Sequence, residues 1–228
     1  MTKELLNDII EWDVTNWSLA LEFWEKNTAQ ELSQTYTMEI GGKRGGLSLW
    51  FAQKGGKVFC TDVDSPVDVA SKKHDAYKVS DRIDYGSVNA LSIPYENKFD
   101  IVVIKSVLAS LGHHDNKDAQ RTAVEQIHKS LKKGGEFMFA ENIKGSPVHQ
   151  FLRRNFVPHG KSVRYTPLED MMEFVSIFSD FKFMTAGFLG GMGRTESQRQ
   201  FLGSIDRAIF NKLFSSSHHY FMIGIARK

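Results

Sequence analysis

Four glycines crowd one short turn of this sequence. The segment EIGGKRGG, residues 39–46, contains Gly41, Gly42, Gly45 and Gly46. Glycine permits positive φ and a close approach of the backbone to a ligand, but each glycine costs chain entropy on folding. Such a concentration of glycines therefore indicates a ligand site rather than a plain connection between two elements.

The residues around the turn restrict the ligand. A dinucleotide fingerprint would need glycine at position 43, where the chain has Lys43, and a triphosphate loop fails because Leu47 follows Gly46. Glu39 would repel a phosphate but suits an ammonium group, and Asp62 is placed to accept hydrogen bonds from ribose hydroxyls. This combination favours S-adenosylmethionine and disfavours an NAD-dependent oxidoreductase.

Strands and helices must alternate to position these residues. The pattern predicts strands over residues 36–40, 57–61, 82–87, 100–104 and 136–140, and helices over residues 46–53, 66–77 and 118–131. The apolar run DIVVI, residues 100–104, is typical of a central parallel strand buried on both faces. Repeating units of this kind predict a doubly wound α/β sheet, in which ligands bind beyond the carboxyl ends of the strands.

The two ends of the chain extend this unit. Residues 3–12 are predicted to be a helix, and Asn16 to cap a second helix that reaches about residue 26. These helices of the segment 1–30 either pack their tryptophans on the main domain or roof a ligand cleft. The C-terminal part is predicted to contain helices 168–178 and 196–214 and strands 181–188 and 220–226. We therefore expect a seven-stranded, mostly parallel sheet in a single domain, residues 1–228, with a cofactor-binding half (36–142) and a substrate-side half (143–228).

The composition sets further limits. The 228 residues are 41% hydrophobic and 25% charged, and the formal net charge of +2 gives no reason to expect a nucleic-acid partner. The lone Cys60 excludes an intrachain disulfide framework, and no His, Cys and Asp cluster has metal-ligand spacing. No apolar run is long enough to span a bilayer, and the acidic N-terminus is unlike a signal peptide, so we expect a cytoplasmic protein. The oligomeric state stays open.

Five segments between residues 36 and 142 resemble, in order, the motifs of class I S-adenosylmethionine-dependent methyltransferases. Residues 39–46 are similar to the acid-x-Gly-x-Gly-x-Gly motif, and Asp62 falls where that family has its ribose-binding acid. The segments VNALSIPY (88–95), FDIVV (99–103) and LKKGGE (131–136) resemble the adenine segment, the fourth-strand motif and the turn into the fifth strand.

This resemblance implies a Rossmann-like methyltransferase fold, S-adenosylmethionine as cofactor, and a set of cofactor contacts. The positions that match are Glu39, Gly41, Gly42, Gly45, Asp62, Val63, Asn89, Ala90, Lys105 and Ser106. Two positions depart from the family pattern. Lys43 replaces the middle glycine, so its backbone must avoid positive φ or the loop is rearranged. Asn89 replaces the usual aspartate, and its amide oxygen can still accept from an adenine amino group.

The acceptor is indicated by a more local resemblance. GGLSLWFAQKGG, KSVLASLG, FAENIKGSPVHQFLRRNF and GRTESQRQFLGSID are similar to bacterial methyltransferases of surface-polysaccharide loci, which implies a small-molecule or sugar hydroxyl as acceptor. The alternative is a protein that binds the cofactor on the same fold without catalysis.

A hydroxyl acceptor must lose a proton, so a general base is sought beyond the fourth or fifth strand. His149 and Glu141 are the candidates, although a structural interpretation of His149, as a surface residue beside a solvated arginine, competes. Asp115 is expected to cap a helix beside His113 and His114. Substrate contacts are predicted for Arg153, Arg164 and Tyr165, and the arginines would suit a phosphate, as in a nucleotide sugar.

Overall fold

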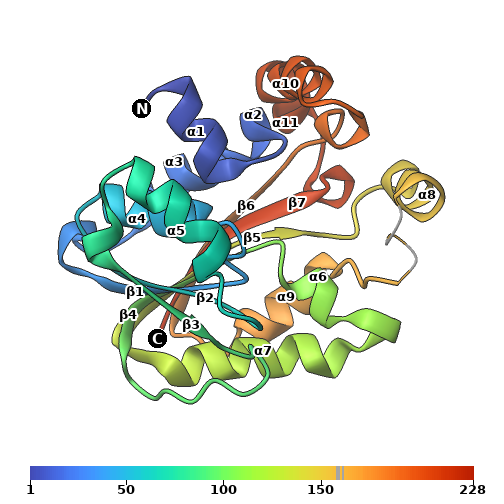
Figure 1. Ribbon diagram of the computed structural model, residues 1–228. Helices are drawn as coiled ribbons and strands as arrows, with labels where there is room; N and C mark the ends of the chain where they lie inside the picture. The colour runs from blue at the N-terminus through green and yellow to red at the C-terminus, as the bar shows by residue number, and fades with distance from the viewer. Residues whose placement is uncertain (158–159, 161) are drawn as a thin grey trace.

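A seven-stranded mixed sheet forms the centre of the computed structural model, which describes residues 1–157, 160 and 162–228 (Figure 1). Its strand order is β3-β2-β1-β4-β5-β7-β6. The strands are β1 (Tyr36–Ile40), β2 (Lys57–Asp62), β3 (Ile83–Ser87), β4 (Phe99–Lys105), β5 (Leu131–Asn142), β6 (Asp180–Ala186) and β7 (Phe221–Arg227). Strands β1 to β5 pair in parallel, whereas β7 runs antiparallel to both β5 and β6. The expected seven-stranded, mostly parallel sheet is confirmed.

The reversed direction of β7 follows from its connection. β6 ends at Ala186 beside Phe221, where β7 begins, so residues 187–220 leave and re-enter the sheet at the same edge. A parallel β7 would need a crossover to the opposite edge. The segment instead places a helix beyond that edge, and β7 fills the position between β5 and β6.

The sheet is covered by helices on both faces. They are α1 (Lys3–Ile10), α2 (Val14–Trp17), α3 (Leu19–Asn27), α4 (Gly46–Gln53), α5 (Val67–Ala76), α6 (Leu108–Leu111), α7 (Lys117–Ser130), α8 (Pro147–Phe156), α9 (Leu168–Val175), α10 (Glu196–Ile205) and α11 (Asn211–Leu213). Helices α1, α3, α4 and α5 lie on one face, and α7 and α9 on the other (Figure 1). The DIVVI run behaves as predicted, because Ile101 to Ile104 are all fully buried in the central strand β4.

The N-terminal tryptophans pack against the sheet, as the first of the two interpretations predicted. Trp17 and Trp24 have no exposed surface, and the Trp24 Nε1 donates to the carbonyl of Gly224 in β7 at 3.0 Å. Asn16 is not a helix cap, which corrects the prediction. It lies buried inside α2 and donates to Asp206 Oδ2 (3.0 Å) and to the Tyr220 hydroxyl (3.1 Å).

Two other helix predictions need correction. The helix predicted over residues 196–214 is interrupted by a π turn at Asp206–Phe210. The reason is the inward turn of the Asp206 carboxylate, which accepts from the backbone N–H groups of residues 188, 189 and 190. Asp115 does not cap α7, because Asn116 occupies that place and accepts from the Ala119 N–H at 3.0 Å.

Candidate active site

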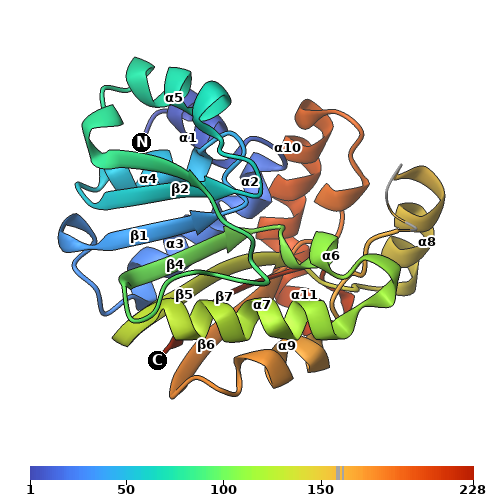
Figure 2. The same ribbon diagram turned by 60° about the horizontal axis from the view of Figure 1, so that its bottom comes forward.

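The glycine turn lies between β1 and α4, at the carboxyl edge of the parallel strands. In Figure 2 the arrows of β1, β2 and β4 point toward this edge, beyond which α2 and α6 lie. Gly41 (φ +75°) and Gly45 (φ +66°) use the left-handed region that favours glycine. Gly42 is required for space instead, since a Cβ there would lie 2.9 Å from Glu39 Cδ. Lys43 has no positive φ, so lysine at the family's glycine position is accommodated without backbone strain.

Glu39 closes the bottom of this turn. Its Oε2 accepts from both the backbone N–H (2.8 Å) and the hydroxyl (2.5 Å) of Ser48, in the first turn of α4. Burial raises the pKa of the Glu39 carboxyl, while the Ser48 hydrogen bonds and Lys105 oppose the rise. Glu39 and Lys105 both line a hollow of about 50 Å³ formed by the glycine turn. The hollow thus presents a carboxylate and an ammonium group to a ligand that carries both charges.

Helix α1 forms the outer wall of the same hollow. Ile9 and Glu11 line it, and Lys105 Nζ donates to the Ile10 carbonyl at 2.5 Å. Lys73, on α5, donates to the Asp8 carbonyl (2.8 Å) and pairs with Glu11 (2.9 Å). The second interpretation of the N-terminal helices therefore also holds in part, because α1 covers the glycine turn. Neither lysine stands out in the sequence as a residue that would hold α1 in this position.

The neighbouring part of the edge carries the predicted ribose and adenine contacts. Asp62 ends β2, and its backbone carbonyl accepts from the Val88 N–H at 2.8 Å, which brings the 88–91 segment beside it. Asn89 Oδ1 accepts from the Leu91 N–H at 2.9 Å and so shapes that turn. Val63 is 66% exposed and Leu91 36% exposed, whereas Ala90 is buried. Two apolar side chains beside a carboxylate form an open surface of the kind that an adenosine group would cover.

The carboxyl ends of β4 and β5 lie on the other side of the glycine turn, because β1 stands between β2 and β4 in the sheet. Ser106 follows β4 with φ +59°, a strained value for a residue other than glycine. Its hydroxyl accepts from Asn142 Nδ2 at 2.7 Å. Glu141 is fully buried, and its Oε1 accepts from the N–H groups of Val107 (2.7 Å) and Leu108 (3.2 Å) at the start of α6. Burial raises the pKa of the Glu141 carboxyl to about 8.

His149 is buried and held from both sides of its ring. Its Nε2 lies 2.7 Å from the Phe188 carbonyl and can only donate to it, so Nδ1 accepts from the Ser146 hydroxyl at 2.8 Å. Together with Ser146, it forms the capping box of α8. The competing surface interpretation is wrong, because only 3% of His149 is exposed. In this conformation neither ring nitrogen is free to take a proton from an acceptor.

The three predicted substrate residues lie together around a cavity of about 570 Å³. Arg153, Arg164 and Tyr165 all line it, beside α8 and the segment that leads to α9. The Arg153 guanidinium lies 4.0 Å from the centroid of the Tyr165 ring, a cation–π contact. It also donates to the Ile143 carbonyl (2.6 Å) and to Asn142 Oδ1 (3.1 Å). Through Asn142 and Ser106, the cavity wall is linked to the end of β4.

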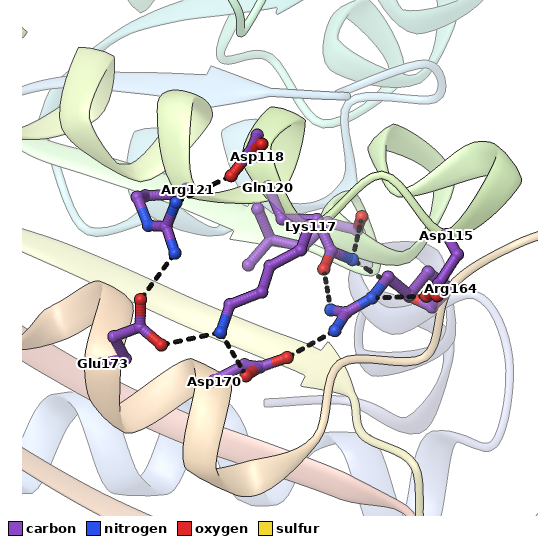
Figure 3. Close-up of polar contacts among 9 residues, drawn as sticks. Asp115, Lys117, Asp118, Gln120, Arg121, Arg164, Asp170 and Glu173 are labelled. Carbon is purple, nitrogen blue, oxygen red and sulfur yellow. Dashed lines mark hydrogen bonds and ion pairs between the residues drawn. The ribbon is translucent and has the colours of Figure 1, made fainter.

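Arg164 has a different role from Arg153, because acidic residues surround it. Figure 3 shows its guanidinium between Asp115 (2.8 Å), Gln120 (2.5 Å) and Asp170 (2.5 Å). Lys117 reaches both Asp170 and Glu173 at 2.7 Å. This network joins α7 to α9. Because Asp115 and Asp170 pair with Arg164, its charge is already neutralised.

Neither a metal site nor a membrane-spanning helix is found in the described part of the chain. Within residues 1–157, 160 and 162–228, no group of three or more His, Cys, Asp or Glu side chains could hold a metal ion. Over the same residues, no helix combines the length and the apolar character needed to cross a membrane.

Comparison with known proteins gives the class of this site. Residues 38–137 match the family model described as "Methyltransferase domain", and this range contains the glycine turn, Asp62 and the 88–91 segment. No curated protein matches the chain in sequence. We conclude that residues 38–137 are a methyltransferase domain and that its cofactor is S-adenosylmethionine.

Solved structures share the fold at low sequence identity. A putative sarcosine dimethylglycine methyltransferase from Galdieria sulphuraria is 14% identical, with a TM-score of 0.65 over 94% of this chain and 85% of its own. Phosphoethanolamine N-methyltransferase 2 from Haemonchus contortus, in complex with S-adenosyl-L-methionine, is 17% identical, with a TM-score of 0.65 over 93% and 52%. The [4+2]-cyclase SpnF is 16% identical, with a TM-score of 0.61 over 92% and 79%.

Proposed function

We propose that the protein transfers a methyl group from S-adenosylmethionine to a hydroxyl of a small molecule, and that this molecule is a sugar of polysaccharide biosynthesis. The observation that carries the proposal is the order of sites along one sheet edge. The glycine turn at β1 lies between a ribose-competent acid at the end of β2 and, on the β5 side, a large cavity lined by charged side chains. An acceptor in that cavity would be linked to the cofactor edge through Asn142 and Ser106.

The cofactor contacts of this proposal are assigned from the positions of the residues. The methionine part of the cofactor is expected at the glycine hollow, with its ammonium group near Glu39 and its carboxylate near Lys105. Asp62 would accept hydrogen bonds from the ribose hydroxyls, and the exposed side chains of Val63 and Leu91 would cover the adenine. Loss of the hydrogen-bond partner of a buried hydroxyl costs roughly 1–3 kcal/mol of binding free energy.

The acceptor hydroxyl must lose a proton, and neither predicted base offers an accessible atom for it in this conformation. Glu141 Oε2 has no hydrogen-bond partner among the described residues, but it is buried. Both ring nitrogens of His149 are engaged, and the Glu141 carboxyl is fully buried. We therefore assign both residues a positioning role, His149 for α8 and Glu141 for α6. The sulfonium already activates the methyl group, so water in the open cavity can take the proton.

The rival function is cofactor binding without methyl transfer. One solved structure of the same fold is that of a [4+2]-cyclase, so the fold alone does not decide between the two. A transfer assay with methyl-labelled S-adenosylmethionine, free sugars and nucleotide sugars separates them, with the product read by mass spectrometry. Labelled product would support the methyltransferase. Cofactor binding without transfer to any acceptor of this class would favour the rival.

A further inference from the structure

Three cationic side chains without a carboxylate partner surround the cavity beside α8. Lys144, Arg153 and Arg154 line it, and among the described residues none of them forms an ion pair. The fourth cation of the lining, Arg164, is neutralised by Asp115 and Asp170. The formal net charge of the whole chain is only +2. The three unpaired cations of this one cavity therefore carry a positive charge at least as large as that net charge.

The Arg153 guanidinium is the most enclosed member of the group. Its hydrogen bonds go to neutral oxygens, which are the carbonyls of Ile143, Lys144 and Tyr220 and the amide oxygen of Asn142. Burial lowers the pKa of Arg153 to about 10, so the side chain remains charged at neutral pH. A charge withdrawn from water without a counterion is costly, and an anion in the cavity would offset that cost.

Lys144 and Arg154 can supply the hydrogen bonds that Arg153 cannot. Both side chains are exposed and line the cavity. Lys144 precedes α8, and Arg154 lies in the last turn of that helix. Nη1 and Nη2 of Arg153 already donate to neutral oxygens. The ammonium group of Lys144 and the guanidinium group of Arg154 can bind several oxygens of one anion. The three residues therefore combine an enclosed charge with exposed donors.

We propose that Lys144, Arg153 and Arg154 bind a phosphoryl group of the methyl acceptor. The inference rests on the proposed function, and it narrows the acceptor to a phosphate ester or diphosphate. The link from Arg153 through Asn142 to Ser106 would keep the phosphoryl group on the β5 side and direct the rest of the acceptor toward the end of β4.

The phosphoryl group could belong to a soluble molecule or to a lipid. The same helix α8 exposes three large apolar side chains, Val148 (50%), Phe151 (62%) and Phe156 (62%). An apolar surface next to a cationic cavity would suit a lipid tail beside its phosphate, whereas a nucleotide sugar would need only the cavity. The shared chemistry is the phosphoryl group, and the experiment must distinguish its sources.

The test uses the full-length chain with the double variant Lys144→Gln/Arg154→Gln. Calorimetry measures inorganic pyrophosphate, and sedimentation measures vesicles of phosphatidylcholine with or without phosphatidylglycerol. We expect pyrophosphate affinity, or affinity for the anionic vesicles, to fall by about tenfold or more, because two charged hydrogen-bond donors are lost. A loss for pyrophosphate assigns a soluble phosphate, and a loss only for anionic vesicles assigns a lipid phosphate.

The control is Lys182→Gln, which removes one exposed positive charge from the edge strand β6, outside the cavity lining. It should leave both affinities unchanged. S-adenosylmethionine affinity should be unchanged in every variant, so a failure to bind the cofactor would count against the proposed function and not against this site. Equal pyrophosphate and vesicle affinities in wild type and double variant would overturn the inference, and so would an equal loss in the control.

Discussion

Replacing Gly45 by alanine tests whether the glycine turn is built for close contact. Gly45 has φ +66°, and a Cβ there would overlap the His74 imidazole and lie 2.9 Å from Ala70 Cβ. The left-handed conformation costs a residue with a Cβ about 1–2 kcal/mol, and overpacking adds about 1–3 kcal/mol. His74 cannot move without loss, because its Nε2 lies 2.8 Å from the Gly45 carbonyl. We therefore expect Gly45→Ala to lower the free energy of unfolding by about 2–5 kcal/mol.

Gly134→Ala is the matched control for this change. Gly134 has φ +77°, but no atom lies within 4 Å of its hypothetical Cβ, so only the conformational cost of about 1–2 kcal/mol applies. Urea unfolding of both variants measures the difference, and calorimetry with S-adenosylmethionine measures the effect on the site. We expect weaker cofactor binding in Gly45→Ala alone. Equal stabilities and equal cofactor affinities in the two variants would refute this account of the turn.

Three further predictions concern polar groups that are buried or partly buried. His149→Ala should lower the unfolding free energy by about 2–4 kcal/mol, because it leaves the Phe188 carbonyl unpaired. The shape of the pH–rate profile should stay the same. If the variant loses the acid limb of that profile, His149 is a general base. Glu141 keeps its proton in the folded chain up to about pH 8 but loses it near 4.5 when unfolded, so stability should decrease as pH rises between these values. Glu141→Gln should reduce that decrease in thermal unfolding, and an unchanged slope would contradict the assignment. Arg164→Met should lower the unfolding free energy by about 1–3 kcal/mol, because it breaks the ion pair with Asp170 that helps to join α7 to α9. Cofactor affinity should stay the same. Reduced cofactor affinity would argue against a purely structural role of Arg164.

The parts of the fold that depend on residues close together in the sequence could be predicted from it. The bounds of β1 and α4 were predicted to the residue, because the glycines after Ile40 end the strand and the apolar segment after Gly45 marks the helix. Arg153, Arg164 and Tyr165 were predicted to contact the substrate because they follow the fifth strand. All three line the cavity beside α8, and their contact with a substrate stays a prediction. In these cases the direction of the chain is enough to place the side chain.

The interactions that could not be predicted join residues far apart in the sequence. His149 is held by a carbonyl 39 residues later, and nothing near it in the chain reveals that partner. The buried hydrogen bond between Asp13 and Tyr220 spans 207 residues, and burial raises the pKa of Asp13 to about 7. Asp13 is an ordinary acid in the sequence. Its burial results from the way that α2 packs against α10 and the start of β7, which depends on the completed sheet.

The most direct measurement for the central claim is a calorimetric titration of wild type and Asp62→Ala with S-adenosylhomocysteine and, separately, with NAD. The claim is that S-adenosylmethionine lies across the glycine turn with its ribose on Asp62. The matched control is Asp64→Ala, which removes an exposed acid two residues later in the chain. We predict that S-adenosylhomocysteine binds wild type and the control equally, that NAD binds far more weakly, and that Asp62→Ala loses roughly 1–3 kcal/mol of binding free energy. Unchanged affinity in a folded Asp62→Ala protein, or NAD binding as tight as that of S-adenosylhomocysteine, would contradict the claim.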